Sequence, residues 1–207
     1  PSAHFYGGRL FAAQGAGINP QIADAHIRPY TIIEFTAGNE VKVPRGNNLN
    51  SMSVKNPGEA EFVARLAQKL LIRMGYDYRL PEDQWPTSRG LVQPTIAIIT
   101  FYEAQRLEIK KILHGSFPAF EDRIDVNTVD SFQGEERDIV IVSTVRVASD
   151  PGFVVSPNRV NVAITRPKSA LFVGLYSMNL ADWDPWRPLL EHAGVRHIPT
   201  NPSETHW

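Results

Sequence analysis

Runs of consecutive apolar residues recur along the second half of the chain and predict buried strands. The segments 95–100 (TIAIIT), 138–146 (DIVIVSTVR) and 170–175 (ALFVGL) are nearly all apolar and rich in β-branched side chains. Such runs are typical of strands covered on both faces, as in a parallel sheet. Shorter strands are predicted at 31–35 and 124–128.

Apolar residues at helical spacing predict the helices beside these strands. The clearest helix begins after Asn56, which can cap it, with Pro57 in the first turn and Glu59 three residues after the cap. Gly75 is suited to end it. We interpret its apolar stripe as core packing. The stripe consists of Ala60, Val63, Leu66, Ala67, Leu70, Leu71 and Met74.

Two further helices are predicted at 102–113 and 158–164, and a Trp-rich helix or turn region at 179–192. One face of the 102–113 helix is basic, and we interpret it as a solvated face. This face carries Arg106, Lys110 and Lys111.

Segments rich in Gly, Asn and Pro predict loops. Residues 1–30 read as irregular, and a Gly- and Asn-rich loop is expected from 36 to 50. Residues 76–94 read as a linker that Trp85 can anchor to the body of the protein. The residues after Gly194 are expected to form a loosely held tail.

Buried strands that alternate with amphipathic helices predict an α/β layer fold with a mostly parallel sheet. We expect residues 1–50 to form an irregular segment and a first strand packed on a lobe of residues 51–193, followed by a tail of residues 194–207.

Ligands of such folds bind at the carboxyl ends of the strands. Three polar clusters fall near predicted strand ends: 100–105, 128–138 and 159–168. The sequence therefore predicts that these clusters form a site.

Composition narrows the class of protein. Hydrophobic residues make up 43% and charged residues 21%, which argues against a disordered, collagen-like or coiled-coil chain. Cysteine is absent, which excludes disulfides and a thiol nucleophile and fits a reducing, intracellular location. The net charge of −1 means that any nucleic-acid binding must depend on a local patch. No apolar run is long enough to cross a bilayer, so we expect no membrane association.

Several common catalytic signatures are missing. No Gly is followed directly by Lys, so there is no G-x-x-x-x-G-K-[ST] phosphate loop. The six histidines lack metal-ligand spacing, and no metal site is expected. Ser131 has no G-x-S-x-G context, which argues against a hydrolase triad.

Five segments nevertheless carry a specific signature. They are VNTVDSFQGEERDIVIVSTVR at 126–146, NRVNVAITRPK at 158–168, ITFYEAQ at 99–105, NPGEA at 56–60 and HFYGGRL at 4–10. In their order and spacing along the chain, they resemble the motifs of superfamily-one helicases of the nonsense-mediated-decay type.

The resemblance implies a fold and a cofactor. Helicases of this family have two RecA-like lobes, with ATP in the cleft between them. This chain resembles the second lobe: an α/β, three-layer RecA-like (P-loop NTPase-type) domain with a mostly parallel sheet that lacks the P-loop itself. The implied cofactor is ATP with Mg, the metal being held by the first lobe. The lack of an initiator Met and of Walker motifs A and B leads us to expect part of a longer protein, inactive by itself.

The resemblance also assigns nucleotide contacts residue by residue. Arg166 matches the arginine finger, whose guanidinium stabilises the charge of the transferring phosphoryl group. Glu136 matches the Glu that contacts the ribose hydroxyls, and Gly134 allows the turn beside it. Arg159 is the weaker candidate for the finger, expected to pair with an acid of the motif instead.

The same resemblance places Thr128 on the nucleic-acid side, where a hydroxyl suits phosphate contacts without base readout. Tyr102 is a candidate of the same kind, with a packed aromatic as an equal alternative. The full set of candidates for nucleic-acid contact is Thr100, Tyr102, Gln105, Thr128, Asp130 and Ser131.

The leading hypothesis is therefore the second motor lobe of an ATP-dependent helicase that grips single-stranded RNA in preference to DNA. Its expected partner is the first RecA-like lobe of the same protein, in a cytoplasmic or nuclear monomer. The alternative is a non-enzymatic RNA- or protein-binding platform built on a helicase-like lobe. An unrelated flavodoxin-like domain ranks last because no Gly-rich phosphate loop follows a strand.

Overall fold

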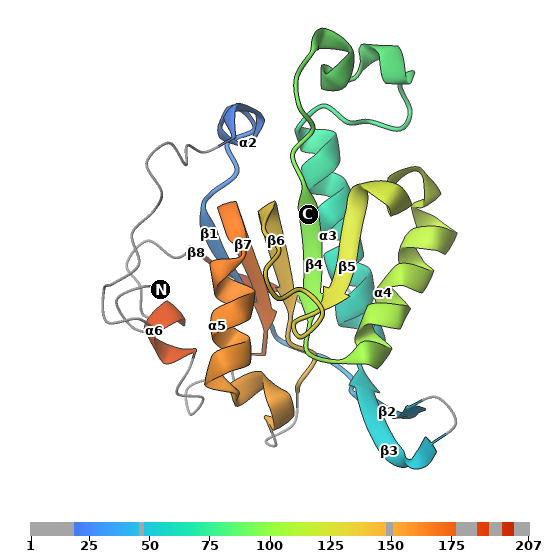
Figure 1. The fold of residues 1–207 in the computed structure, drawn as a ribbon, viewed down its shortest axis with the longest axis vertical. Helices are drawn as coiled ribbons and strands as arrows, with labels where there is room; N and C mark the ends of the chain where they lie inside the picture. The colour runs from blue at the N-terminus through green and yellow to red at the C-terminus, as the bar shows by residue number, and fades with distance from the viewer. Residues whose placement is uncertain (1–18, 46–47, 148–150, 177–185, 191–195, 201–207) are drawn as a thin grey trace.

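A six-stranded parallel sheet forms the centre of the molecule in the computed structural model, which describes residues 19–45, 48–147, 151–176, 186–190 and 196–200. The strand order is β5-β4-β6-β7-β1-β8, and every neighbouring pair is parallel (Figure 1). The strands are β1 (Tyr30–Phe35), β4 (Ile96–Thr100), β5 (Ile124–Thr128), β6 (Arg137–Ser143), β7 (Pro167–Leu175) and β8 (Arg196–Thr200).

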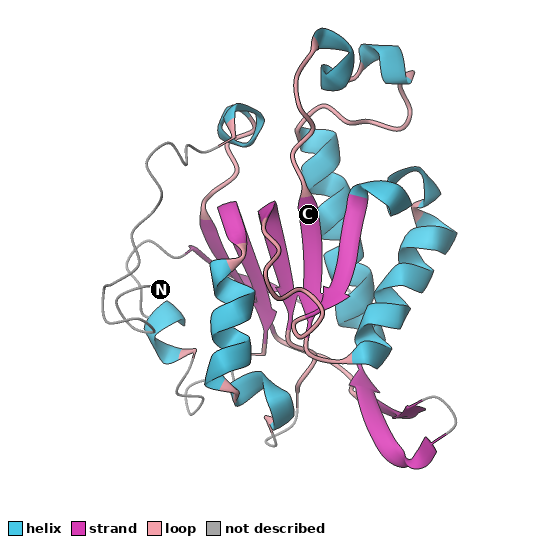
Figure 2. Cartoon of the chain, in the orientation of Figure 1, coloured by secondary structure: helices cyan, strands magenta, loops and turns pink. Residues whose placement is uncertain are grey.

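Helices cover both faces of this sheet, as Figures 1 and 2 show. Successive residues of β4 alternate between two apolar cores: Ile98 belongs to one and Ile99 to the other. The helices α3 (Pro57–Arg73) and α4 (Glu103–Ser116) pack in the first core, and α5 (Pro157–Thr165) packs in the second. The predicted three-layer α/β fold with a parallel sheet is therefore confirmed.

The remaining helical elements are short. They are α2 (Pro20–Asp24), η1 (Glu82–Gln84), η2 (Pro86–Arg89), η3 (Pro118–Arg123), η4 (Gly152–Val155) and α6 (Arg187–Leu190). None of the helices in the described part of the chain combines the length and the apolar character that a membrane span needs.

The start of α3 follows the prediction except for one side chain. The Asn56 side chain accepts a hydrogen bond from the backbone N–H of Glu59 at 3.3 Å, and Pro57 occupies the first turn. Gly75 follows the helix with φ +94°, a conformation that glycine adopts at low cost. The Glu59 carboxylate, however, turns into the protein interior, where its partners lie on β6 and just beyond it.

A β-hairpin replaces the loop that was predicted between residues 36 and 50. Strands β2 (Val41–Arg45) and β3 (Asn48–Lys55) pair antiparallel, with an irregularity after Pro44. Their apolar residues alternate with polar ones only over short stretches, at 41–43 and 52–55, and Gly and Asn residues surround these stretches, so the pattern indicated a loop. Contacts to α4 hold the hairpin in place: the Ser53 hydroxyl accepts from the Ala104 N–H at 3.2 Å.

Strand β8 corrects a second expectation, because it lies in the predicted tail and pairs with β1 along its whole length.

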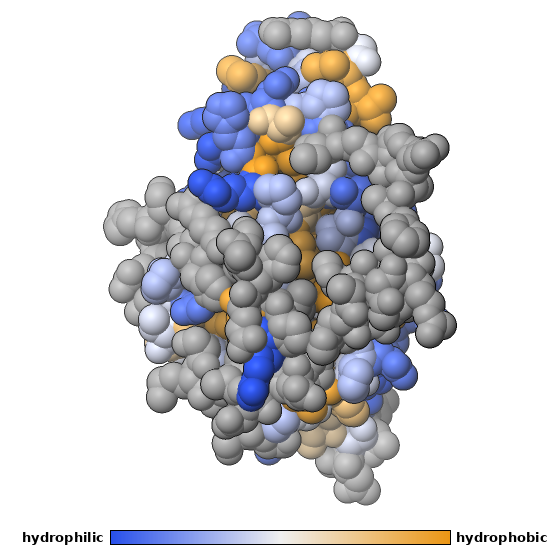
Figure 3. Space-filling model, turned by 90° about the vertical axis from the view of Figure 1, so that its left-hand side faces the viewer, coloured by the Kyte–Doolittle hydropathy of each residue, from blue (hydrophilic) through white to orange (hydrophobic). Residues whose placement is uncertain are grey.

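The predicted linker 76–94 is anchored as expected: the Trp85 ring is buried, and its indole N–H donates to the Asp77 carbonyl at 2.8 Å. Apolar residues of this linker are exposed, Val92 most of all, and Figure 3 shows apolar surface at the upper end of the molecule. The motif at 4–10 lies outside the described residues.

Candidate functional site

Two hydroxyl side chains meet at the carboxyl edge of the sheet. Thr128 ends β5, and Ser131 lies three residues further in the turn that follows. Their hydroxyl oxygens are 2.9 Å apart, and the Ser131 hydroxyl donates to the Thr128 carbonyl at 3.0 Å while accepting from the Thr128 N–H at 3.0 Å. Ser131 is exposed and Thr128 is half-buried, so this turn presents hydroxyl groups and backbone to solvent.

Three other candidates for nucleic-acid contact are buried beneath this edge. Thr100 and Gln105 have no exposed surface, and Tyr102 is 3% exposed. The Tyr102 ring packs against Phe153 with 5.9 Å between the ring centroids, which supports the packed-aromatic alternative. Side chains this deep support the edge from below, and direct contact of Thr100, Tyr102 and Gln105 with a nucleic acid stays a prediction.

The nucleotide candidates lie elsewhere, at the opposite, amino edge of the sheet. Gly134 is exposed with φ +88°, a left-handed conformation in which any other residue would be strained. Glu136 immediately precedes β6 and is exposed. Arg166 lies between α5 and β7, and its backbone carbonyl accepts from the Arg137 N–H at 3.2 Å.

The expectation that all three polar clusters share the carboxyl edge is therefore wrong for Glu136 and Arg166. The loop 129–136 leaves the carboxyl edge after β5 and must reach the amino edge, where β6 begins. Helix α5 makes the same crossing on the way to β7. A loop that joins parallel strands places its two ends at opposite edges, which the motif alone does not reveal.

Loop 129–136 and α5 are tied together at both ends. At the carboxyl edge, Arg159 of α5 donates twice to the Asp130 carboxylate, at 2.8 Å each, and this pairing raises the pKa of Arg159. At the amino edge, Arg166 donates to the Glu135 carbonyl at 3.5 Å. Arg159 therefore pairs with an acid of the motif, as predicted, and one rigid helix spans the two edges.

The positive charge of Arg166 has no carboxylate partner among the described residues. Its guanidinium donates to the Val162 carbonyl at 3.1 Å and to the Thr165 hydroxyl at 3.2 Å, both neutral acceptors. Arg137, by contrast, pairs with the carboxylates of Asp125 at 2.6 Å and Glu135 at 2.7 Å. Arg166 is therefore a half-buried cation that an anionic ligand can neutralise.

A buried polar network escaped the sequence analysis. Glu59 is completely buried, and its carboxylate accepts from the Ser143 hydroxyl at 2.7 Å and the Val145 N–H at 3.1 Å. Burial raises the pKa of Glu59 to about 7, against the lowering effect of these hydrogen bonds. Gln105 completes the network: its amide nitrogen donates to the Ser143 hydroxyl at 3.0 Å and to the Asn56 carbonyl at 3.3 Å, and its amide oxygen accepts from the Asn56 N–H at 2.8 Å. The signal was present in the NPGEA and ITFYEAQ motifs, but spacing does not show that they meet.

The network holds a strained turn after β6. Val145 has φ +72°, which is unusual for a β-branched residue and costs of order 1–3 kcal/mol. The Glu59 carboxylate binds its N–H, and the Asn56 amide donates to its carbonyl at 3.4 Å. The next residue, Arg146, forms a largely buried ion pair with Glu40 at 3.3 Å. This turn begins the connection from β6 to α5.

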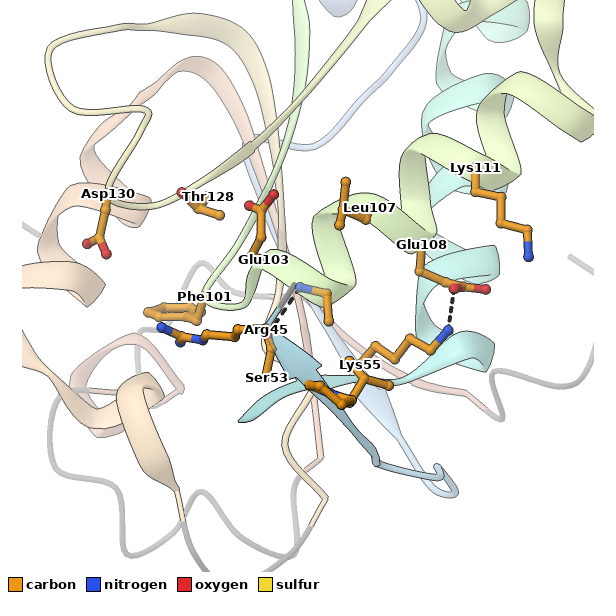
Figure 4. Close-up of a pocket in the computed structure, with 13 residues that line it drawn as sticks. Arg45, Ser53, Lys55, Phe101, Glu103, Leu107, Glu108, Lys111, Thr128 and Asp130 are labelled. Carbon is orange, nitrogen blue, oxygen red and sulfur yellow. Dashed lines mark hydrogen bonds and ion pairs between the residues drawn. The ribbon is translucent and has the colours of Figure 1, made fainter. Parts of the chain in front are cut away.

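Thr128 and Asp130 also line a cleft of about 590 Å³ between the β2–β3 hairpin and α4 (Figure 4). Within the described ranges, no three His, Asp or Glu side chains lie close enough together to hold a metal ion.

Comparisons with known proteins agree with the motifs. A family model described as an AAA domain matches residues 1–174 of this chain. Helicase SEN1 of Saccharomyces cerevisiae is 30% identical over 203 residues, which cover 95% of this chain and 8% of the yeast protein.

Two animal proteins are similar over about half of the chain. Probable helicase senataxin of Homo sapiens is 40% identical over 104 residues, 49% of this chain and 4% of the human protein. Regulator of nonsense transcripts 1 of Caenorhabditis elegans is 40% identical over 108 residues, 49% of this chain and 10% of the worm protein. The chain thus spans at most a tenth of these relatives.

Proposed function

Because the chain belongs to the superfamily-one helicases of the nonsense-mediated-decay type, we propose that it is the second motor lobe of an ATP-dependent helicase acting on single-stranded RNA. The observation that carries the proposal is the pairing of loop 129–136 with α5. One end of this pair presents Thr128 and Ser131, and the other presents Glu136 and Arg166.

The amino edge is the nucleotide side in this proposal. Arg166, with its uncompensated guanidinium, stabilises the charge that develops on the transferring phosphoryl group. Glu136 is exposed, and its carboxylate accepts from the ribose hydroxyls. The phosphate loop and the Mg²⁺ ligands, which supply the remaining electrostatic stabilisation, belong to the first lobe.

The carboxyl edge is the nucleic-acid side. The hydroxyls of Thr128 and Ser131 and the backbone of their turn contact phosphate groups and read no base. Asp130 serves this edge indirectly, because its carboxylate is occupied by Arg159. Closure of the first lobe on Arg166 then shifts α5 and the turn as one unit, so that hydrolysis is coupled to movement along the strand.

ATP hydrolysis tests the proposal. We expect no turnover from the chain alone and RNA-stimulated turnover from a polypeptide that also carries the first lobe. In that polypeptide Arg166→Ala lowers kcat by about 10³-fold or more, the order found for arginine fingers. Lys168→Ala is the matched control, because Lys168 is an exposed cation two residues away. Its kcat should equal that of the wild type.

Two other outcomes of the ATP hydrolysis assay would contradict the proposal. Turnover by the chain alone that Arg166→Ala abolishes would contradict the division of labour between lobes. No turnover in either form, together with RNA binding, would favour the non-enzymatic platform. Parallel assays with a DNA oligonucleotide of the same sequence test the preference for RNA.

A further inference from the structure

The cleft between the hairpin and α4 has rigid walls that the proposed function does not use (Figure 4). The Ser53 hydroxyl of β3 accepts from the Ala104 N–H at the start of α4. About one turn of α4 later, Lys55 of β3 binds the Glu108 carboxylate at 2.6 Å. These two contacts fix the hairpin against the helix, so the cleft is formed before any ligand arrives.

Each acid that lines the cleft is neutralised by a cation. Glu108 pairs with Lys55, and Asp130 pairs with Arg159 on the outer side. The third acid, Glu103, accepts from the Arg106 guanidinium at 2.8 Å, and this hydrogen bond holds the pKa of Glu103 below its usual value.

Two lining cations remain without an ion pair among the described residues, Arg45 of β2 and Lys111 of α4. Arg45 adds a longer-range contribution to the lowered pKa of Glu103, which places its charge at the same end of α4. Both side chains are exposed. The cleft therefore has a positive excess with one charge toward each end of the exposed α4 face.

Apolar surface lies between these charges. Leu107 lines the cleft and is 53% exposed, which is high for a leucine on a packed helix. Val43 and Pro44 of the hairpin face the same space. A surface with cations at its ends and apolar groups between them suits a chain that carries phosphates along its backbone and flat apolar faces beside them.

The cleft is continuous with the nucleic-acid side of the proposed function. Thr128 and Asp130 lie at one end in Figure 4, and Lys111 lies at the other. Along α4 the distance from Glu103 to Lys111 is eight residues, about 12 Å. We propose that this cleft takes the next stretch of the single-stranded nucleic acid that Thr128 contacts, with Arg45 and Lys111 bound to its phosphates. The proposal rests on the proposed function and extends its binding surface onto the hairpin.

Charge reversal tests the proposal on the whole chain. The variants Arg45→Glu and Lys111→Glu are compared with Lys110→Glu, which makes the same change on the same helix at a residue that does not line the cleft. Fluorescence anisotropy with a labelled oligouridylate measures affinity against salt concentration. We expect each cleft variant to lose about tenfold in affinity, the order of one charge-assisted hydrogen bond, and to lower the salt slope by about 0.7. The control should lower both quantities less than either cleft variant does, because Lys110 does not line the cleft, and all three should keep the thermal midpoint of the wild type.

The outcomes distinguish failure of the cleft proposal from failure of the proposed function on which it rests. If the wild type binds and Ser131→Glu weakens binding, but Lys111→Glu behaves like Lys110→Glu, the cleft is overturned and the motor lobe stands. If the wild type binds no oligonucleotide at low salt, the nucleic-acid side of the proposed function fails first. If polyglutamate competes as well as RNA does and loses equally with Lys111→Glu, the cleft takes acidic polypeptide, which also overturns the proposal.

Discussion

The buried carboxylate of Glu59 predicts that folding stability depends on pH in an unusual direction. Its pKa is raised from 4.5 to about 7 in the native protein because burial disfavours the charged form. Below pH 4.5 both native and unfolded chains hold the proton. Between pH 4.5 and 7 the native chain keeps it and the unfolded chain releases it, so stability falls as the pH rises. Above pH 7 both forms are ionised and this contribution is constant.

The size of the effect follows from the shift. A difference from 4.5 to about 7 corresponds to roughly 3 kcal/mol of unfolding free energy lost across this window. Glu59→Gln removes the ionisation and keeps the shape of the protonated side chain. The difference in stability between variant and wild type should therefore change by about 3 kcal/mol in favour of the variant between pH 4.5 and pH 8.

Urea unfolding at a series of pH values, followed by tryptophan fluorescence, measures this difference. Glu61→Gln is the matched control, since Glu61 lies on the same helix and its side chain is half exposed. Its difference from the wild type should stay within about 0.5 kcal/mol at every pH. If the curves of Glu59→Gln and the wild type run parallel, Glu59 titrates normally, and the account of the buried network is wrong.

Two further variants test the capping residue and the link between the edges. Asn56→Ala removes the cap of α3 and an amide that donates to the Tyr176 hydroxyl at 2.8 Å. We expect urea unfolding to show a loss of about 2–3 kcal/mol in unfolding free energy. The control Asn158→Ala, at an exposed residue, should lose no more than about 0.5 kcal/mol. Arg159→Ala breaks a largely exposed pair and should cost at most about 1 kcal/mol. In the two-lobe polypeptide it should keep basal ATP hydrolysis and lose stimulation by RNA; equal loss of both would refute the coupling.

The fold was predictable where local pattern and tertiary structure agree. The β-branched run of β4 and the Asn56 cap with its apolar stripe each specify an element without help from distant residues. Strand β8 was missed because its pairing partner, β1, lies far along the chain. The β2–β3 hairpin pairs locally, but its support comes from α4, some 50 residues further along the chain. The alternation of the hairpin itself is too short to predict two strands.

The motifs name the residues of the candidate site, whose roles stay predictions, but they do not show where those residues lie in the fold. The motifs pointed to Arg166, Glu136 and Thr128, and the family comparison agrees with the motifs. Which edge each residue occupies depends on the direction of the loops. The burial of Gln105 depends on helix α3, some 49 residues earlier in the chain.

The position of β1 makes the sheet slow to complete. β1 is an internal strand, and its neighbours are β7, where Tyr30 pairs with Leu171, and β8, where Thr31 pairs with Arg196. During synthesis β1 therefore leaves the ribosome long before β7 and β8 are made, and its apolar residues stay exposed until then. Pairings between residues this distant in sequence favour slow folding, and until they form, β1 has unpaired edges that are prone to aggregation. Because β1 can be buried only after β7 and β8 are made, folding of the first strand of the sheet depends on its last two strands.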